Sequence, residues 1–218
     1  MPTVQKALPT TTLTDCRACP RLASFLDEVK VDNPTYFCKP VQPFGADAPG
    51  LLIVGLAPGL HGANRTGRPF TGDHAGILLY ETLHKFGFAS RPVSVSADDG
   101  LQLINCRITN AVKCLPPANK PETAEIRQCN AYLKTELASL KPGTAVLALG
   151  NVAHAAVLMA LGLKAKACAF GHGAVHDLAC GLRLYDSYHC SRYNTQTRRL
   201  TPEMFQAVFA RITTDQKE

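Results

Sequence analysis

Side chains that could bind and react with a small ring gather in a glycine-rich stretch at residues 51–73. The stretch begins with a short apolar run, LLIVG, and continues as a loop rich in glycine and polar groups. The polar and aromatic side chains of the loop are those of His61, Asn64, Arg65, Thr66, Arg68, Phe70 and Asp73. Such a set could stack on a ring, hydrogen-bond its edge and contact a phosphate. The motifs GxxxxGK[ST] and GxGxxG are absent, which argues against those two kinds of nucleotide-binding loop. A surface loop with helix-capping residues is the alternative interpretation.

Four of the nine cysteines form a second pattern. Cys16 and Cys19 have C-x2-C spacing, and Cys114 and Cys129 follow further along the chain. Four thiolates suit either tetrahedral zinc or a [4Fe–4S] cluster, and the ligand types do not separate the two. Small buried apolar side chains are the alternative, because free cysteine is commonly a core residue. That interpretation is preferred for the cysteines without a pattern, which are Cys38, Cys106, Cys168 and Cys180.

Length and composition indicate one globular domain over residues 1–218, with about 12 flexible residues at the N-terminus and about 5 at the C-terminus. The net charge of +6 is compatible with a polyanionic partner. No apolar run approaches the ~20 residues of a membrane span, and the N-terminus lacks a secretory signal core. We therefore expect a monomeric cytoplasmic protein without a membrane partner, whose cysteines would not form disulfides.

Strand and helix patterns alternate along the chain. Short apolar runs predict strands within residues 51–55, 101–112, 144–149 and 182–188. Helical spacing and capping residues predict helices within residues 74–88, 121–140, 151–161 and 201–209. This alternation predicts an α/β protein, a three-layer α/β/α sandwich with a central, mostly parallel sheet. The loop after residue 55, Asn110 and His189 would then meet at the carboxyl ends of the strands, where such sheets bind ligands.

The segments GLAPG, HGANRTGRPFTGD, TNAVKCLPP and SYHCSRYNTQTRRLT resemble the uracil-DNA glycosylase superfamily, most closely its fifth family, type B. The resemblance covers nearly the whole chain. It implies the three-layer fold and a [4Fe–4S] cluster on Cys16, Cys19, Cys114 and Cys129. It also implies hydrolytic removal of uracil, and often of hypoxanthine or other deaminated bases, from DNA.

The resemblance assigns a role to each residue of the presumed base site. Phe70 matches the aromatic residue that stacks on the flipped base, Asn110 the amide that reads its edge, and His189 the histidine beside uracil O2. Asp73 matches an acidic residue proposed to position the attacking water. Ala57 stands where several sister families carry a water-activating carboxylate, which the fifth family also lacks. The implied base-binding residues are thus Gly55, Ala57, Phe70, Asn110 and His189, and the implied catalytic residues are Asp73, Asn110 and His189.

Ordinary structural roles compete with these assignments. Asp73 precedes a predicted helix and is by default an N-cap, Asn110 could be a turn residue and His189 a strand-end histidine. The expected phosphate contacts are Arg65, Arg68, Ser191, Arg192, Asn194 and Gln196, with a solvated basic loop as the alternative. Cys190 and Gly59 depart from proline and alanine, which are common in relatives, and this leaves the substrate range open.

Three function classes follow from these observations. The preferred one is a monofunctional DNA repair glycosylase that flips a deaminated base out of DNA and hydrolyses its N-glycosidic bond. The second is a damaged-DNA binding module without activity, motivated by the alanine at position 57. The third is an electron-transfer protein built around the cluster. Release of free uracil separates the first class from the second, and the third predicts a cluster that is readily oxidised and reduced.

Overall fold

The computed structural model describes residues 12–217. The N-terminal segment that was expected to be flexible lies outside the described residues, apart from residue 12. A six-stranded sheet has the order β1-β3-β2-β4-β6-β5. Its strands are β1 (Phe44–Gly45), β2 (Leu51–Gly55), β3 (Cys106–Asn110), β4 (Ala145–Leu149), β5 (Val175–Asp177) and β6 (Arg183–Ser187). The four central strands are parallel and the two short edge strands are antiparallel, which confirms the predicted mostly parallel sheet.

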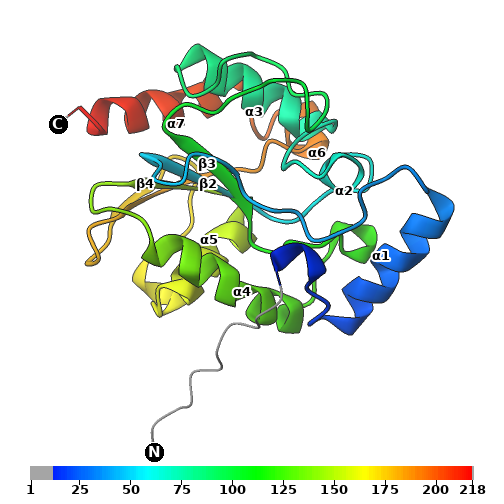
Figure 1. The fold of residues 1–218 in the computed structure, drawn as a ribbon. Helices are drawn as coiled ribbons and strands as arrows, with labels where there is room; N and C mark the ends of the chain where they lie inside the picture. The colour runs from blue at the N-terminus through cyan, green and yellow to red at the C-terminus, as the bar shows by residue number, and fades with distance from the viewer. Residues whose placement is uncertain (1–11, 218) are drawn as a thin grey trace, which may run out of the picture.

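Helices cover both faces of the sheet (Figure 1). The longer helices are α1 (Pro20–Asp32), α3 (His74–Lys85), α4 (Thr123–Ala138), α5 (Asn151–Ala160) and α7 (Pro202–Asp215). Helices α3 and α7 lie on one face, and α4 and α5 lie on the other (Figure 1). The short helices α2 (Ala63–Thr66) and α6 (Arg192–Gln196) lie in the loops that follow β2 and β6. The predicted three-layer α/β/α architecture is therefore confirmed.

Alternate side chains of each central strand enter the two hydrophobic cores. Leu51 and Ile53 pack toward α3 and α7, whereas Leu52 and Val54 pack toward α4 and α5. All four are fully buried, and burial on both faces explains why the strand is a continuous apolar run and does not alternate with polar residues. The register pairs Gly55 with Asn110, so β2 and β3 end side by side.

Several elements differ from the sequence-based expectations. Helix α1 was not predicted, although Leu22, Leu26 and Val29 are its buried stripe. The strand expected within residues 101–112 is confined to Cys106–Asn110. The last helix continues beyond residue 209 to Asp215, whose carboxylate accepts a hydrogen bond from the Tyr185 hydroxyl at 2.9 Å. Residues 214 and 215, expected to be flexible, are therefore the end of this helix.

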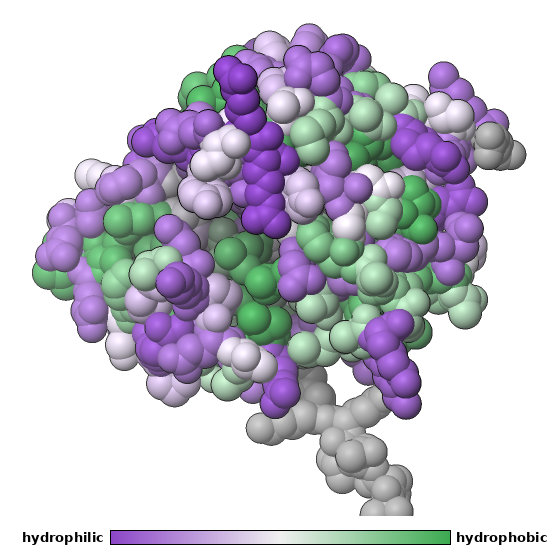
Figure 2. Space-filling model, turned by 180° about the vertical axis from the view of Figure 1, so that it is seen from behind, coloured by the Kyte–Doolittle hydropathy of each residue, from purple (hydrophilic) through white to green (hydrophobic). Residues whose placement is uncertain are grey.

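Surface polarity is mixed on the face seen in Figure 2, where hydrophilic and hydrophobic residues alternate over short distances. No helix in the described part of the chain combines the length and apolar composition needed to cross a membrane.

Candidate base-binding site and cysteine site

A cavity of about 410 Å³ opens at the carboxyl ends of the central strands. Its walls come from the loops after β2, β3, β4 and β6, as the predicted sheet requires. The side chains that the sequence singled out and that line it are Ala57, Phe70, Asp73, Asn110, His189 and Ser191. Asn119 and Asn151 also line it and were not anticipated, because one lies in a short 3₁₀ turn and the other opens α5.

Asn110 brings an amide to the floor of the cavity. It is the last residue of β3, almost fully buried, and its side-chain oxygen has no hydrogen-bond partner in the described structure. A Cβ atom on Gly55 would lie 2.4 Å from this oxygen and 2.6 Å from the Phe70 ring. Glycine at position 55 therefore keeps open the space between the amide and the ring, and the free amide oxygen can accept a hydrogen bond from a ligand.

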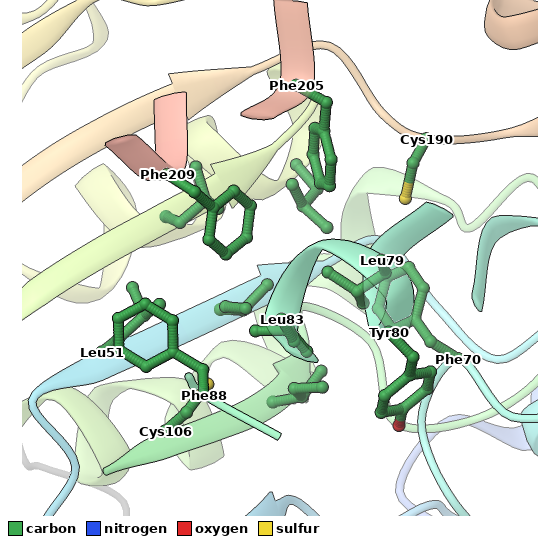
Figure 3. Close-up of a cluster of buried hydrophobic side chains, with 14 of the residues drawn as sticks. Leu51, Phe70, Leu79, Tyr80, Leu83, Phe88, Cys106, Cys190, Phe205 and Phe209 are labelled. Carbon is green, nitrogen blue, oxygen red and sulfur yellow. The ribbon is translucent and has the colours of Figure 1, made fainter. Parts of the chain in front are cut away.

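Phe70 lies near the end of the loop, where contacts with α3 hold its backbone in place. Its backbone has a φ of 54°, in the left-handed region that non-glycine residues rarely adopt. The Tyr80 hydroxyl donates a 2.8 Å hydrogen bond to the Pro69 carbonyl, and a Cβ on Gly76 would lie 1.9 Å from the Phe70 carbonyl oxygen. Figure 3 shows the Phe70 ring beside Leu79 and Tyr80 of α3. The surrounding core thus fixes the position of an aromatic face at the cavity.

His189 follows β6 and its ring stacks on Phe70, with centroids 5.8 Å apart and an interplanar angle of 27°. Asn194 donates a 2.8 Å hydrogen bond to the His189 carbonyl. The next residue in the chain, Cys190, is fully buried in the core (Figure 3). Desolvation lowers the pKa of His189 to about 4. The imidazole is therefore neutral at pH 7 and offers one N–H donor.

Asp73 is both a helix N-cap and a residue of the cavity wall. Its Oδ1 accepts a 2.9 Å hydrogen bond from the Gly76 amide, so it is the N-cap of α3. Its Oδ2 lies 2.4 Å from the place of a Cβ on Gly62 and 3.6 Å from that of a Cβ on Gly59. Burial raises the pKa of Asp73, against the lowering effect of the helix N-terminal amides. One oxygen thus caps the helix, while the carboxyl group also borders the cavity.

Arg68 is not placed for the expected phosphate contact. Its side chain is buried, forms a 2.7 Å ion pair with Asp99, and lies over the Phe44 ring at 4.4 Å. The Arg68 guanidinium therefore fastens the loop around residue 70 to the segment before β3. Arg65 is exposed and donates to the His61 carbonyl at 2.8 Å, so its charge still faces solvent.

The segment after His189 forms α6, which Ser191 caps by accepting a 3.4 Å hydrogen bond from the Asn194 amide. Arg192 and Gln196 are exposed, whereas Asn194 is partly buried and supports the His189 backbone. Of the six residues expected to contact DNA, the structure brings Ser191 to the cavity wall and leaves Arg192 and Gln196 exposed on α6.

Cys16, Cys19, Cys114 and Cys129 line a second, smaller cavity between α1 and α4. Burial raises the pKa of the Cys19 thiol to about 11 and raises those of Cys114 and Cys129, and negative charge on neighbouring cysteine sulfurs adds to each increase. The Lys113 amide donates to Cys129 Sγ at 3.3 Å. Such thiols need a bound cation to be held as thiolates, and a metal centre would supply it.

The walls of the cysteine cavity are joined by charged side chains. Arg21 of α1 donates two hydrogen bonds to Glu125 of α4, at 2.8 and 2.7 Å. Glu125 also accepts from the Glu122 amide at 2.7 Å as part of the capping box of α4. The Arg21–Glu125 pair, 104 residues apart in the chain, thus joins the two helices beside the predicted cysteines.

Comparison with known proteins agrees with this geometry. The uracil DNA glycosylase superfamily model matches residues 42–213. A type-5 uracil-DNA glycosylase of Thermus thermophilus is 47% identical over 89% of this chain and 90% of its own length. Those of Mycobacterium leprae and Pyrobaculum aerophilum are 45% and 44% identical, over 89% and 93% of this chain and 88% and 90% of their own lengths. The chain therefore belongs to the uracil-DNA glycosylase superfamily and is a DNA glycosylase, a hydrolase that cleaves N-glycosyl bonds.

Proposed function

We propose that the protein excises uracil from DNA by hydrolysing the N-glycosidic bond of a flipped nucleotide, and that it leaves an abasic site. The observation that carries this proposal is the buried, unpartnered amide oxygen of Asn110 beside the Phe70 ring in a cavity open to solvent. Uracil presents an N–H between two carbonyl groups, so the amide can accept from the N–H and donate to a neighbouring oxygen. Hypoxanthine also presents an N–H beside a carbonyl, and it belongs to the same proposal.

Catalysis requires stabilisation of charge that develops as the bond breaks. The leaving base becomes negative and the sugar becomes positive, so a donor aimed at the base oxygen stabilises the transition state more than the ground state. His189 is neutral at pH 7 because its pKa is about 4, and it would donate its N–H to that oxygen. The stacked Phe70 ring offsets part of the few kcal/mol that flipping costs.

Asp73 is proposed to orient the attacking water. Its carboxyl group lies at the cavity wall, and position 57 provides no carboxylate to compete for this role. The negative charge would also favour the positive sugar of the transition state. Among the described residues no lysine lines the cavity, so the proposal includes no Schiff base and no strand cleavage by the protein.

A [4Fe–4S] cluster on Cys16, Cys19, Cys114 and Cys129 is the second part of the proposal. A single tetrahedral zinc ion would hold its sulfur ligands about 3.8 Å apart. Among these described cysteines no three have sulfur atoms that all lie within 4.8 Å of one another, which favours the larger cluster. Bound there, the cluster would supply a cross-link between α1, the segment at Cys114 and α4. We propose a structural role for it, not electron transfer.

Single-turnover reactions with end-labelled duplexes test the proposed excision. Each duplex contains one U·G, U·A or hypoxanthine·T pair, with a T·A duplex as the matched control. Strand cleavage that appears only after alkali, together with free uracil in the supernatant, is the expected result. Tight binding without base release from any duplex would contradict excision and support the non-catalytic binding module, for which the alanine at position 57 is the motivating observation.

A further inference from the structure

Two imidazoles and a carboxylate meet outside both sites. They belong to His154 on α5, His176 on β5 and Asp186 on β6, and one ligand atom from each lies within 4.8 Å of the other two. His154 Nδ1 is 2.7 Å from Asp186 Oδ1, and His176 Nε2 is 3.4 Å from Asp186 Oδ2. Neither the cavity residues nor the four cysteines contribute to this cluster.

The hydrogen-bond partners of His154 fix which ring nitrogen carries its proton. His154 Nε2 is 3.1 Å from the carbonyl oxygen of Cys168, which can only accept, so Nε2 is the donor. In the neutral ring the lone pair of Nδ1 then faces the Asp186 carboxylate, which is also an acceptor. Two acceptors 2.7 Å apart need a proton or a cation between them.

Two polar atoms of the cluster lack hydrogen-bond partners. Asp186 Oδ2 and His176 Nε2 are buried and have no hydrogen-bond partner in the described structure. The Asp186 side chain is fully buried, and its ion-pair partners in the described part of the chain are these two histidines, with no lysine or arginine. A buried carboxylate without full compensation is costly, so the arrangement requires a positive charge at this point.

We propose that His154 Nδ1, His176 Nε2 and the Asp186 carboxylate bind a divalent transition-metal ion, with Zn²⁺ as the best-suited ion. Adjacent ligands of tetrahedral zinc are about 3.4 Å apart, which is the separation of His176 Nε2 and Asp186 Oδ2. His154 Nδ1 and Asp186 Oδ1 are 2.7 Å apart and would have to separate slightly to admit the ion. The bond from His154 Nε2 to a backbone carbonyl is the outer contact that zinc-binding histidines commonly make. His176 is partly exposed on the edge strand β5 and provides the entry path.

The position of the site suggests what the ion would do. It would join α5, β5 and β6 at a point three residues before His189. The segment that carries His189 into the base cavity would then be tied to two other elements. None of the three residues lines the base cavity, so the proposed role of the ion is positioning of the His189 segment.

Zinc uptake by protein that already holds its [4Fe–4S] cluster tests this proposal. Wild-type protein, His176→Gln and the matched control His84→Gln, an exposed histidine on α3, are dialysed anaerobically against micromolar Zn²⁺. Zinc and iron are then counted by mass spectrometry. We expect one zinc per chain in addition to a full iron content in wild type and His84→Gln. Loss of a ligand should weaken zinc binding in His176→Gln by at least about tenfold.

Cobalt distinguishes this site from the cysteine site. Co²⁺ bound by imidazoles and a carboxylate shows visible d–d bands without the sulfur-to-metal charge-transfer band that thiolate ligands add. His154→Gln serves as a second variant should His176→Gln fail to fold. Zinc-free wild-type protein, or equal zinc binding by wild type and both folded variants, would overturn the proposal and indicate a network held by a shared proton.

Discussion

The base cavity and the cysteine site differ in size and in how their polar groups are satisfied. The first has a volume of about 410 Å³ and the second of about 40 Å³. In the first, Asn110 leaves an acceptor without a partner, whereas in the second the Lys113 amide already bonds to Cys129 Sγ. A free acceptor in an open cavity suits a ligand that binds and leaves, whereas four cysteines around a small cavity suit a permanently bound group. The difference supports the proposal that the first site carries out chemistry and the second stabilises the fold.

Removal of one cysteine should have the largest effect. Cys114→Ala is expected to lose the cluster and to unfold the contact of α1 with α4, because a bound metal centre contributes folding free energy directly. Iron content and the urea unfolding midpoint measure this, with Cys180→Ala, an exposed cysteine outside the site, as the matched control. A cluster-free Cys114→Ala protein that is as stable and active as wild type would remove the architectural role.

Two arginine variants separate residues that stabilise the loop around the base cavity from residues that contact DNA. Arg68→Ala should lower the free energy of unfolding by about 1.5–3 kcal/mol, because the Asp99 carboxylate loses its charged donor and keeps only hydrogen bonds from backbone amides. Arg192→Ala, on the exposed surface of α6, should leave stability unchanged and weaken DNA binding in a salt-dependent manner. Urea unfolding and the salt dependence of the DNA dissociation constant measure the two effects. The reverse result would show that Arg68 is the phosphate contact.

Asp73→Asn separates helix capping from catalysis. Asparagine caps helices about as well as aspartate, so the unfolding midpoint should change little. Single-turnover uracil release should fall by about 10²-fold, because the amide lacks the charge that orients water. Near-normal release by Asp73→Asn would leave the N-cap as its only role.

A pH series of unfolding experiments tests the environment of His189. Its pKa is about 4 in the folded protein and 6.5 ordinarily, so between these values the unfolded chain binds a proton that the folded chain does not. The free energy of unfolding should therefore fall as the pH decreases from 6.5 toward 4, by less than about 1.4 kcal/mol per pH unit from this group. His189→Gln should lack this part of the slope. Identical slopes for both proteins would show that His189 is not desolvated.

Local patterns in the sequence were sufficient for much of the fold. Apolar runs next to glycine or ending in polar residues located the central strands, and parallel topology then placed Phe70, Asn110 and His189 together. Edge strands of two or three residues, such as β1 and β5, are too short to show a period. Helix α1 was missed although its buried stripe is regular.

Long-range partners explain what sequence reasoning could not supply. Arg68 resembles a surface phosphate contact until Asp99, 31 residues away, is seen to pair with it. The two roles of Asp73 likewise became compatible only when the separate positions of its carboxylate oxygens were known. The cluster of His154, His176 and Asp186 has no short-range motif, because a helix and two strands contribute one residue each.

The most direct test of the central claim is the single-turnover rate of uracil release by wild type and His189→Ala, with the DNA dissociation constant and iron content of each. A neutral donor to the leaving base predicts a rate about 10²–10³-fold lower in the variant, with DNA binding and iron content nearly unchanged. Equal rates in the two proteins would show that the base cavity does not act through His189 and would contradict this account.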